Sequence, residues 1–478
     1  MLMKTDGADR TSPAHDIRNN DNTQMGDKAT RGLADKQVGA NAQCPDKEVI
    51  EYLASNFRLD NEYRDATLSM TASENHMSKM ARAAGAGLHG SFYEFGPPYL
   101  VKPGEWGFPD SGAQAAFAAR GSGIGCKLFE AETFDWRPNG GSNAEQAIML
   151  GNCRRGDAFV HFAHQDGGHF ALEDLARACG IQVLHFPMVE RTLLIDVDRL
   201  RQDIDDHPNI TAIILDQSFK LRGQPLEQIR AAVPGRIFLA YDASHDAGLI
   251  AGHELPQPTL LGFDAIHANT HKTIPGPQKA FIAFRDRNHP KLKAVSEWVC
   301  PKLQSNCHVE QLAPLTIALA EIQSFGRPYA RQTRANAKAL AHALVREGFR
   351  VSGEAFDYSE THQVHVLLGT QAKAEGVALD ILSQAGIRTN PIEIPGSRGM
   401  YGLRLGTQAL TRRGMREAEM TEIAKFYSRL VMQNEDPRNV RADVAYLARQ
   451  FPLTNLPYSF DKYLPDRVSE EFFKEVLR

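Results

Sequence analysis

The sequence has few cysteines, no excess of one charge and no long hydrophobic run. Its six cysteines are spread over 478 residues without a Cys-x-x-Cys pair, so we expect reduced thiols and a cytoplasmic protein rather than a disulfide framework. The 54 basic and 58 acidic residues give a formal net charge of −4, which favours a small-molecule partner over nucleic acid. No stretch approaches the roughly 18 uncharged residues of a membrane-spanning helix, and the charged N-terminus carries no apolar signal segment. Neither membrane insertion nor secretion is indicated.

Three segments of the chain differ in composition. Residues 1–45 are polar and almost free of aromatic and branched apolar side chains, which predicts a flexible N-terminal arm. Residues 46–325 begin with a helical apolar stripe and continue with short apolar runs between helical stretches, which predicts a large, mostly parallel α/β domain. After a long helical region from about 310 to 347, residues 326–478 predict a smaller α+β domain. The expected strands are Ala158–Ala163, Val183–Phe186, Ile210–Leu215, Ile237–Ala240, Phe263–Ala268, Ala280–Phe284, Phe349–Ser352 and Val364–Leu368.

An aspartate and a lysine follow two neighbouring strands of the large domain. Asp242 stands in the run Asp-Ala-Ser-His245, and Lys272 stands in Asn-Thr-His-Lys-Thr. Because the carboxyl ends of strands in an open α/β sheet face one crevice, we expect the two side chains to share a ligand site. A lysine that holds an aldehyde and a carboxylate that keeps a ring nitrogen protonated suit pyridoxal phosphate. Taken alone, such a pair is more often an exposed lysine and an aspartate that caps a turn. The flanking residues make the cofactor site the favoured interpretation.

A glycine-rich turn precedes a helix at Asn-Gly-Gly141-Ser142. Backbone N–H groups at a helix N-terminus and a serine cap suit a phosphate group. The same pattern is equally an ordinary capped turn.

Three histidines occur close together at His161, His164 and His169. A strand that turns into a Gly-Gly loop scatters their directions, and no cysteine or paired acid completes a shell, so we do not expect a metal site here. His169, directly after Gly168, is placed to lay its ring on a flat cofactor. The alternative is a structural loop histidine.

Three further segments offer candidate substrate contacts. Arg404 lies on a short apolar strand between glycines, where a guanidinium can bind a carboxylate through two hydrogen bonds. Arg412 and Arg413 are more simply explained as a solvated helix start with a carboxylate partner. Tyr93 lies in a loop rich in glycine and proline and is a possible proton donor near a substrate hydroxyl, although a packed loop aromatic is the commoner case.

Together these motifs resemble serine hydroxymethyltransferase and its relatives among the fold-type I pyridoxal-phosphate enzymes. The resemblance runs from residue 46 to about 430. It implies a large domain with a mostly parallel sheet of the seven-stranded type, a smaller C-terminal α+β domain, pyridoxal 5'-phosphate as cofactor, and a homodimer with active sites at the subunit interface. The matching segments are Thr71–Asn75, Gly141–Ser142, Gly168–His169, Asp242–His245, Thr270–Thr273, Gly276–Pro277 and Gly402–Gly414.

The resemblance also implies a role for each matching residue. Lys272 forms the Schiff base, and Asp242 pairs with the pyridine nitrogen. The other assignments are His169 on the cofactor ring, Ser218 and His245 near its phenolic oxygen, His271 beside the lysine, Gly141 and Ser142 at the phosphate, Arg404 at the substrate carboxylate, and Tyr93 reaching in from the neighbouring subunit.

Two departures from the hydroxymethyltransferases point away from folate. Where that family has a glutamate two places after the tyrosine, this chain has Phe95, with a glutamate only at Glu94. The segment between Gly386 and Arg404 is shorter than the family's folate-contacting loop and lacks its pattern.

Longer segments look like the L-threonine transaldolases, which build β-hydroxy-α-amino acids for natural products. This resemblance covers residues 46–478. It implies that L-threonine is cleaved to acetaldehyde and a glycyl carbanion, which adds to a second aldehyde, and the analogy favours an aromatic one. Gln304 and Ser305 are then expected near the cofactor phosphate across a dimer interface. The segments are Phe134–Ser142, Ile214–Arg222, Asn269–Gln278, Trp298–His308 and Tyr458–Tyr463.

Some details of the reaction stay open at this level. Tyr93, His169 and Glu145 are the candidates for moving the hydroxyl proton. The acceptor aldehyde is expected to contact the loop 93–106 and the segment 390–400. A folate-dependent hydroxymethyltransferase, a threonine aldolase and a non-catalytic pyridoxal-phosphate-binding protein are the alternatives.

Overall fold

The structure is a computed structural model that describes residues 47–87, 90, 92–93, 113–170, 172–189 and 192–476. The predicted arm, residues 1–45, lies outside these ranges. The first element is α1 (Lys47–Asp65), which confirms the helix expected there and lies mainly in a compact unit formed by Met1–Asn61. The remaining elements lie in a second unit, Glu62–Arg478.

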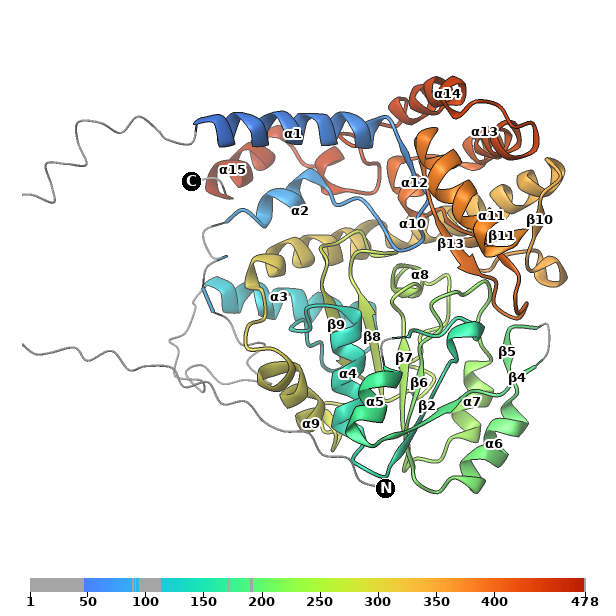
Figure 1. The fold of residues 1–478 in the computed structure, drawn as a ribbon. Helices are drawn as coiled ribbons and strands as arrows, with labels where there is room; N and C mark the ends of the chain where they lie inside the picture. The colour runs from blue at the N-terminus through green and yellow to red at the C-terminus, as the bar shows by residue number, and fades with distance from the viewer. Residues whose placement is uncertain are drawn as a thin grey trace, which may run out of the picture. The chain divides into compact units, whose positions relative to one another are not determined.

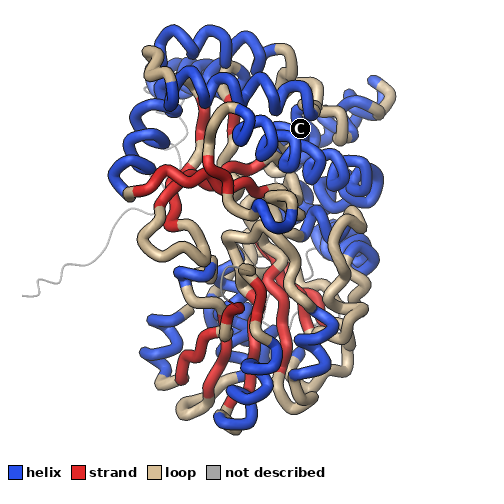
Figure 2. The backbone as a smooth tube through the Cα atoms, turned by 90° about the vertical axis from the view of Figure 1, so that its right-hand side faces the viewer, coloured by secondary structure: helices blue, strands red, loops and turns tan. Residues whose placement is uncertain are grey.

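A six-stranded sheet forms the centre of the second unit, with the strand order β3-β2-β6-β7-β8-β9. Neighbouring strands are parallel except for β8 and β9, which are antiparallel. Figure 2 shows helices on both sides of these strands. The strands are β2 (Ala158–His161), β3 (Gln182–His185), β6 (Ile210–Leu215), β7 (Phe238–Asp242), β8 (Ala265–Asn269) and β9 (Ala280–Phe284). All six expected strands of this domain are present.

The sheet has one strand fewer than the seven implied by the resemblance. At its β9 edge the chain forms only an isolated antiparallel bridge, in which Asp135 and Ile282 exchange both backbone hydrogen bonds at 2.7 and 2.9 Å. Pro138 accepts a further bond from Ala280 but has no N–H to donate, which prevents the bridge from extending into a regular ladder.

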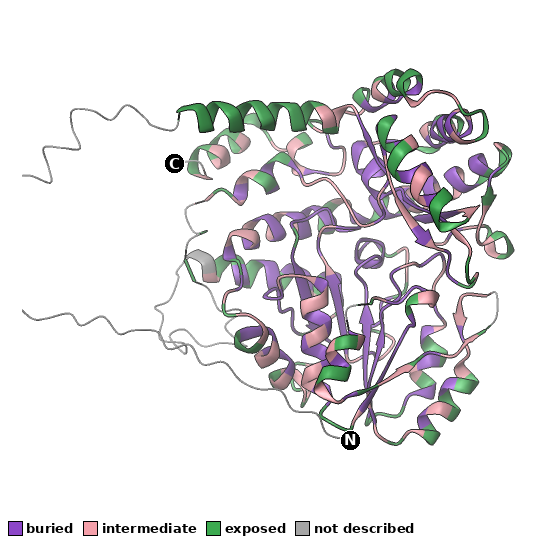
Figure 3. Ribbon diagram, viewed as in Figure 1, coloured by how far each residue is buried: buried purple, intermediate pink, exposed green. Residues whose placement is uncertain are grey.

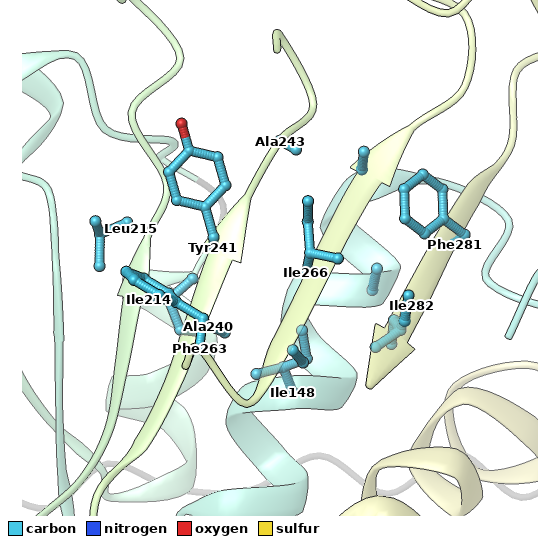
Figure 4. Packing of buried hydrophobic residues seen from close by; sticks show 14 of the residues in the cluster. Ile148, Ile214, Leu215, Ala240, Tyr241, Ala243, Phe263, Ile266, Phe281 and Ile282 are labelled. Atoms are coloured by element: carbon cyan, nitrogen blue, oxygen red, sulfur yellow. The ribbon is translucent and has the colours of Figure 1, made fainter. Parts of the chain in front are cut away.

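Apolar side chains cover both faces of the sheet, which explains why its strands are continuous apolar runs. Figure 4 shows Ile214, Ala240 and Ile266 from neighbouring strands packed in one cluster with Ile148 from α4. Figure 3 shows the strands largely buried and the outer helix faces exposed, except that the edge strand β3 is only partly buried. The helices of this part are α2 (Lys79–Ala84), α3 (Ala113–Leu128), α4 (Gly141–Asn152), α5 (Glu173–Cys179), α6 (Val197–Asp206), α7 (Leu226–Ala232), α8 (Ala247–Ala251) and α9 (Leu292–Glu297), with a short hairpin of β4 (Met188–Val189) and β5 (Leu194–Ile195).

The long helix α10 (Leu312–Arg346) connects this core to a second one. Its first half, up to Tyr329, packs in the first apolar cluster, and Ala337 to Leu344 pack in the second. Pro328 lies inside the helix. The predicted helical region, about 310 to 347, is confirmed within two residues at its start.

The second core surrounds a four-stranded antiparallel sheet with the order β10-β11-β14-β13. Leu68 and Met70 also belong to this core, because β1 (Leu68–Ser69) pairs with β12 (Ile387–Arg388). The domain boundary near residue 325 stays a prediction. The remaining elements, visible in Figure 1, are β10 (Arg350–Val351), β11 (Gln363–Gly369), α11 (Gln371–Glu375), β13 (Asn390–Glu393), β14 (Tyr401–Gly406), α12 (Gln408–Arg413), α13 (Glu417–Tyr427), α14 (Pro437–Arg449) and α15 (Asp466–Val476).

The sequence predicted reduced cysteines and gave no indication of a membrane-spanning helix. The five cysteines of the described ranges are free thiols. Within the same ranges, no helix combines the length and the apolar character needed to cross a membrane.

Candidate active site

A cavity of about 620 Å³ opens where the carboxyl ends of the first sheet face the second sheet. Five residues predicted from the sequence line it: His169, Ser218, His245, Lys272 and Arg404. They come from elements far apart in the chain, and the parallel strands bring most of them to one edge.

Lys272 follows β8 and is almost fully buried. Its Nζ lies 3.3 Å from Nε2 of His245, and its carbonyl accepts a hydrogen bond from the Asn75 side chain at 2.5 Å. Burial lowers the pKa of Lys272 to about 8, a shift opposed by the charge of Asp242 and assisted by that of Arg404. A substantial neutral fraction near neutral pH is what a nucleophilic amine requires.

Asp242 ends β7 and lies buried in the wall behind the cavity lining. Burial raises the pKa of this carboxyl. The charges of His267 and Lys272, together with the hydrogen bond that Ser244 N–H donates at 2.7 Å, lower the pKa further than burial raises it. Asp242 is therefore a stable anion that can pair with a protonated ring nitrogen.

Glu145, on the first turns of α4, faces Asp242 from the other side. The Glu145, Asp242 and His267 side chains each bring one atom within 4.8 Å of the others. Burial and the negative charges of Asp242 and Asp216 raise the pKa of Glu145 well above its ordinary value. Since two adjacent buried carboxylates cannot both ionise, Glu145 is the protonated member.

His169 is positioned by a backbone that only glycine allows. A Cβ on Gly168 would lie 1.9 Å from the carbonyl oxygen of Phe162. The His169 N–H donates to Asp216 Oδ2 at 3.2 Å, and its Nδ1 lies 3.5 Å from Glu145 Oε2. Burial lowers the pKa of His169, opposed by the charge of Asp242, so the imidazole is neutral at neutral pH.

Arg404 lies on β14 with its guanidinium buried and stacked over the Phe219 ring at 4.7 Å. Its Nε approaches Asn390 Oδ1 at 3.4 Å. No carboxylate of the described residues lies within ion-pair distance, and burial lowers the pKa of Arg404 to about 10. An uncompensated buried cation that lines a cavity is a receptor for an anionic group.

His245 lies between the lysine and the small domain. Its ring stacks on His362 with centroids 5.6 Å apart. Burial lowers its pKa well below the ordinary value, and its Nδ1 is buried without a hydrogen bond partner among the described residues. Ser218 is held nearby by its N–H, which donates to Gly167 O at 2.6 Å.

The expected phosphate turn differs in one detail from the sequence interpretation. The N-cap of α4 is Gly140, with no side-chain cap, so Ser142 is not the cap that its position suggested. The N–H of Gly141 donates to Asn269 Oδ1 at 2.8 Å, and the absence of a side-chain cap from Gly140 leaves the backbone donors of the next residues for an anion. A Cβ on Gly141 would lie 2.3 Å from Nδ2 of Asn269, so a larger residue there would displace the Asn269 side chain.

Several predicted residues lie away from the cavity in this single chain. Tyr93 is 46% exposed and Ser305 is exposed, and neither lines the cavity. Gly141, Ser142 and His271 also do not line it, and burial lowers the pKa of His271 to about 4. Residues 94–106, with Glu94 and Phe95, lie outside the described ranges.

The interpretation of Arg412 and Arg413 as a solvated helix start is wrong, because both side chains are buried. Arg412 Nη2 pairs with Glu321 Oε2 at 2.5 Å. Arg413 donates to the carbonyls of Thr67 and Ala448 at 2.7 and 2.6 Å. These arginines hold the N-terminal and C-terminal segments together rather than meeting solvent.

The sequence missed several residues of the cavity wall. Phe170 and Phe219 directly follow the predicted residues His169 and Ser218 in the sequence, and this proximity is the only feature that could have indicated them. Gln371 and Glu375, one turn apart on α11, carry no motif that could have indicated them. Asn390 and its neighbours to Glu393 line the cavity within the segment expected to contact the acceptor.

The residues present fit pyridoxal phosphate. The cavity and its wall hold a buried lysine of lowered pKa, a buried anionic aspartate behind it and a His245 nitrogen without a partner among the described residues. The N-terminus of α4, which does not line the cavity, has no side-chain cap from Gly140. Lys272 would hold the aldehyde, Asp242 the ring nitrogen, and the turn at Gly141 the phosphate.

Comparison with known proteins supports this fit. The serine hydroxymethyltransferase family profile matches residues 45–427. Serine hydroxymethyltransferase of Thermococcus onnurineus is 34% identical over 87% of this chain and 97% of that protein, and that of Pyrococcus furiosus is 35% identical over 86% and 97%. The crystal structure of L-threonine transaldolase from Pseudomonas fluorescens in its internal aldimine state has a TM-score of 0.88 and 46% identity, over 90% of this chain and 98% of that one. The protein is a fold-type I transferase with pyridoxal 5'-phosphate as cofactor, and the chain belongs to the serine hydroxymethyltransferase family.

Proposed function

We propose that the enzyme is an L-threonine transaldolase. It cleaves L-threonine to acetaldehyde and a glycyl carbanion, and the carbanion adds to a second, aromatic aldehyde to give a β-hydroxy-α-amino acid. The observation that carries the proposal is the buried Arg404, which has no carboxylate partner in the described residues and faces the same cavity as Lys272. The 46% identity with a transaldolase, against 34–35% with the two hydroxymethyltransferases, favours this reaction within the family.

Arg404 binds the carboxylate of L-threonine. The planar guanidinium is held from one side by Phe219 and from its Nε by Asn390, which leaves its terminal nitrogens for the substrate. Two parallel charge-assisted hydrogen bonds fix the orientation of the amino acid as well as its affinity.

The bound cofactor supplies an aldehyde for the substrate amine and an electron-withdrawing ring that stabilises the carbanion left by C–C cleavage. Asp242, ionised at neutral pH, holds the proton on the ring nitrogen. Glu145 keeps its own proton, so this pair of neighbouring carboxyl groups carries one negative charge rather than two.

His169 accepts the hydroxyl proton of threonine when the C–C bond breaks. Its neutral ring lines the cavity of the same chain, whereas Glu145 lies behind that lining and is already protonated. The same ring returns the proton to the alkoxide formed from the second aldehyde.

The acceptor aldehyde occupies the outer part of the cavity. Its wall includes the aromatic rings of Phe170, Phe219 and Tyr401, which suit an aromatic aldehyde. We also propose that the enzyme is a homodimer in which Tyr93 of one subunit reaches the cavity of the other. The molar mass from light scattering tests whether the protein is a dimer in solution.

The test is incubation of the purified enzyme with L-threonine and a panel of aldehydes without folate, while acetaldehyde and the amino acid products are both measured. A transaldolase gives acetaldehyde and the new β-hydroxy-α-amino acid in equal amounts. Release of glycine in place of that product identifies a threonine aldolase. Serine turnover that requires tetrahydrofolate identifies a hydroxymethyltransferase.

A further inference from the structure

Three potential metal ligands meet at the open edge of the main sheet, away from the 620 Å³ cavity lining. His161 ends β2, His185 ends the edge strand β3, and Glu173 is the first residue of α5, the helix that connects these strands. His161 and His185 are paired residues in the parallel register, so their side chains extend from the same face of the sheet. The connecting helix then brings the carboxylate over both rings.

The distances among the three side chains suit one small cation. Glu173 Oε1 lies 3.1 Å from His185 Nε2 and 3.6 Å from His161 Nε2, and one atom from each residue falls within 4.8 Å of the other two. Tetrahedral zinc with bonds of about 2.0–2.1 Å places its ligand atoms roughly 3.3 Å apart. The observed spacings lie on either side of that value.

One buried nitrogen of this cluster, His161 Nε2, lacks a partner in a way that a bound cation would explain. His161 is fully buried, and its Nε2 has no hydrogen bond partner in the described part of the chain. Its Nδ1 lies 3.1 Å from Asp216 Oδ2. A carboxylate on Nδ1 places the ring proton there and leaves the Nε2 lone pair directed toward Glu173, the arrangement that supports histidine ligands of zinc.

Arg177 binds one oxygen of Glu173, Oε2, and leaves the other oxygen, Oε1, facing both histidines. The side chains of His185 and Glu173 are 41% and 20% exposed, so water can reach a fourth coordination position.

We propose that His161, Glu173 and His185 bind one divalent cation of the zinc type, with water as the fourth ligand. Two imidazoles and one carboxylate favour zinc over magnesium or calcium, which prefer all-oxygen shells. The sequence did not indicate this site, because the three histidines that are close in the chain, His161, His164 and His169, were not expected to bind a metal, and the proposed partners lie 12 and 24 residues from His161.

The cation also supports the active site through one carboxylate. Asp216 Oδ2 faces His161 Nδ1 and accepts the backbone N–H of His169 at 3.2 Å. Metal binding at Nε2 strengthens the Nδ1–H bond to Asp216 and so fixes the loop that presents His169. The site is a positioning site and does not touch substrate.

The test uses the tag-free holoenzyme, stripped with a chelator and then titrated with Zn²⁺ or with Co²⁺, whose tetrahedral complexes absorb visible light. The expected result is one tightly bound ion per chain by elemental analysis, with visible absorption for cobalt. His185→Ala, at an exposed position that tolerates substitution, lowers the affinity by more than about 100-fold, and Glu173→Gln lowers it as well.

The matched control is His342→Ala. His342 Nε2 lies 2.7 Å from Asp357 Oδ1 in a similarly exposed pair, to which the described residues add no third ligand. This variant keeps the wild-type stoichiometry and affinity. If the wild-type chain retains no ion after dialysis, or if His185→Ala binds as tightly as wild type, the three residues form only an ion pair with protonated histidine and the proposal is wrong.

Discussion

Two clusters of histidine and carboxylate side chains occur on the main sheet, and they differ in their access to water. Glu145, Asp242 and His267 are all buried behind the cavity, whereas the second cluster, built around Glu173 and His185, opens to solvent at the sheet edge. In both, one atom of each member lies within 4.8 Å of the others. The two clusters have similar distances between their side chains but suit different chemistry, and the access of water to each cluster decides which chemistry that is.

In the enclosed cluster, two carboxyls share one negative charge because water cannot screen a second. This leaves one ionised aspartate for the cofactor ring. At the edge, a single carboxylate stays ionised beside Arg177 and has room for a cation and its water. Four predictions separate these two cases.

The largest effect is expected for Asp242→Asn. Loss of the buried charge removes the group that keeps the ring nitrogen protonated, and turnover of L-threonine falls about 10²-fold to 10³-fold. Steady-state kinetics measure this, and zinc affinity at the edge cluster stays unchanged as the control. Turnover near the wild-type rate would show that the enclosed cluster does not serve the cofactor.

Arg404→Lys tests a third charged group, the guanidinium of Arg404. This group is buried like the first cluster but has no carboxylate partner among the described residues. A lysine keeps the charge and loses the bidentate geometry, so the KM for L-threonine rises about 10-fold to 100-fold and kcat changes less. The matched control is Arg398→Lys, on an exposed part of the same domain, which leaves KM unchanged. An equal fall in kcat with constant KM contradicts carboxylate binding by Arg404.

The pH dependence of cofactor attachment tests the charges that surround Lys272. Since its pKa is lowered to about 8, the neutral amine is lost as pH falls below that value, and attachment to the apoenzyme slows there and levels off above it. Stopped-flow absorbance of added cofactor measures the rate. Because the charge of Asp242 raises this pKa, Asp242→Asn moves the midpoint to lower pH, and a midpoint that does not move contradicts the coupling.

The smallest effect is expected for Glu145→Gln. A protonated glutamate and a glutamine are both neutral and have nearly the same shape, so the charge beside Asp242 is unchanged and turnover changes less than about 10-fold. The absorbance of bound cofactor as a function of pH gives an independent measure of the ring environment, which we expect to be near wild type. A loss comparable to that of Asp242→Asn would mean that Glu145 transfers a proton during turnover.

The sequence predicted the sheet well because its signals are local. The strands Ile210–Leu215 and Ala280–Phe284 have the predicted bounds, since strands covered on both faces are largely apolar runs that end at polar residues. Asp242 could be singled out because it closes such a run, Lys272 because it follows one after three residues, and Arg404 because it is a charged residue within one. The topology then brings them to one cavity.

What the sequence could not show depends on contacts between distant segments. Arg412 and Arg413 look like a polar helix end, and only the segments around Glu321 and Ala448 make their burial possible. Glu173 and His185 carry no motif, and their meeting with His161 depends on strand register. The protonation of Glu145 follows from an aspartate almost a hundred residues away.

The continuity of α10 limits how substrate can enter. Because one helix is packed into both apolar cores, the two sheets that enclose the cavity cannot separate as independent bodies, and widening the entrance requires the helix to flex. Pro328, which lacks an N–H for the helical ladder, is where flexing costs least. We therefore expect entry of the proposed substrate, L-threonine, to be accompanied by a small change of curvature in this helix.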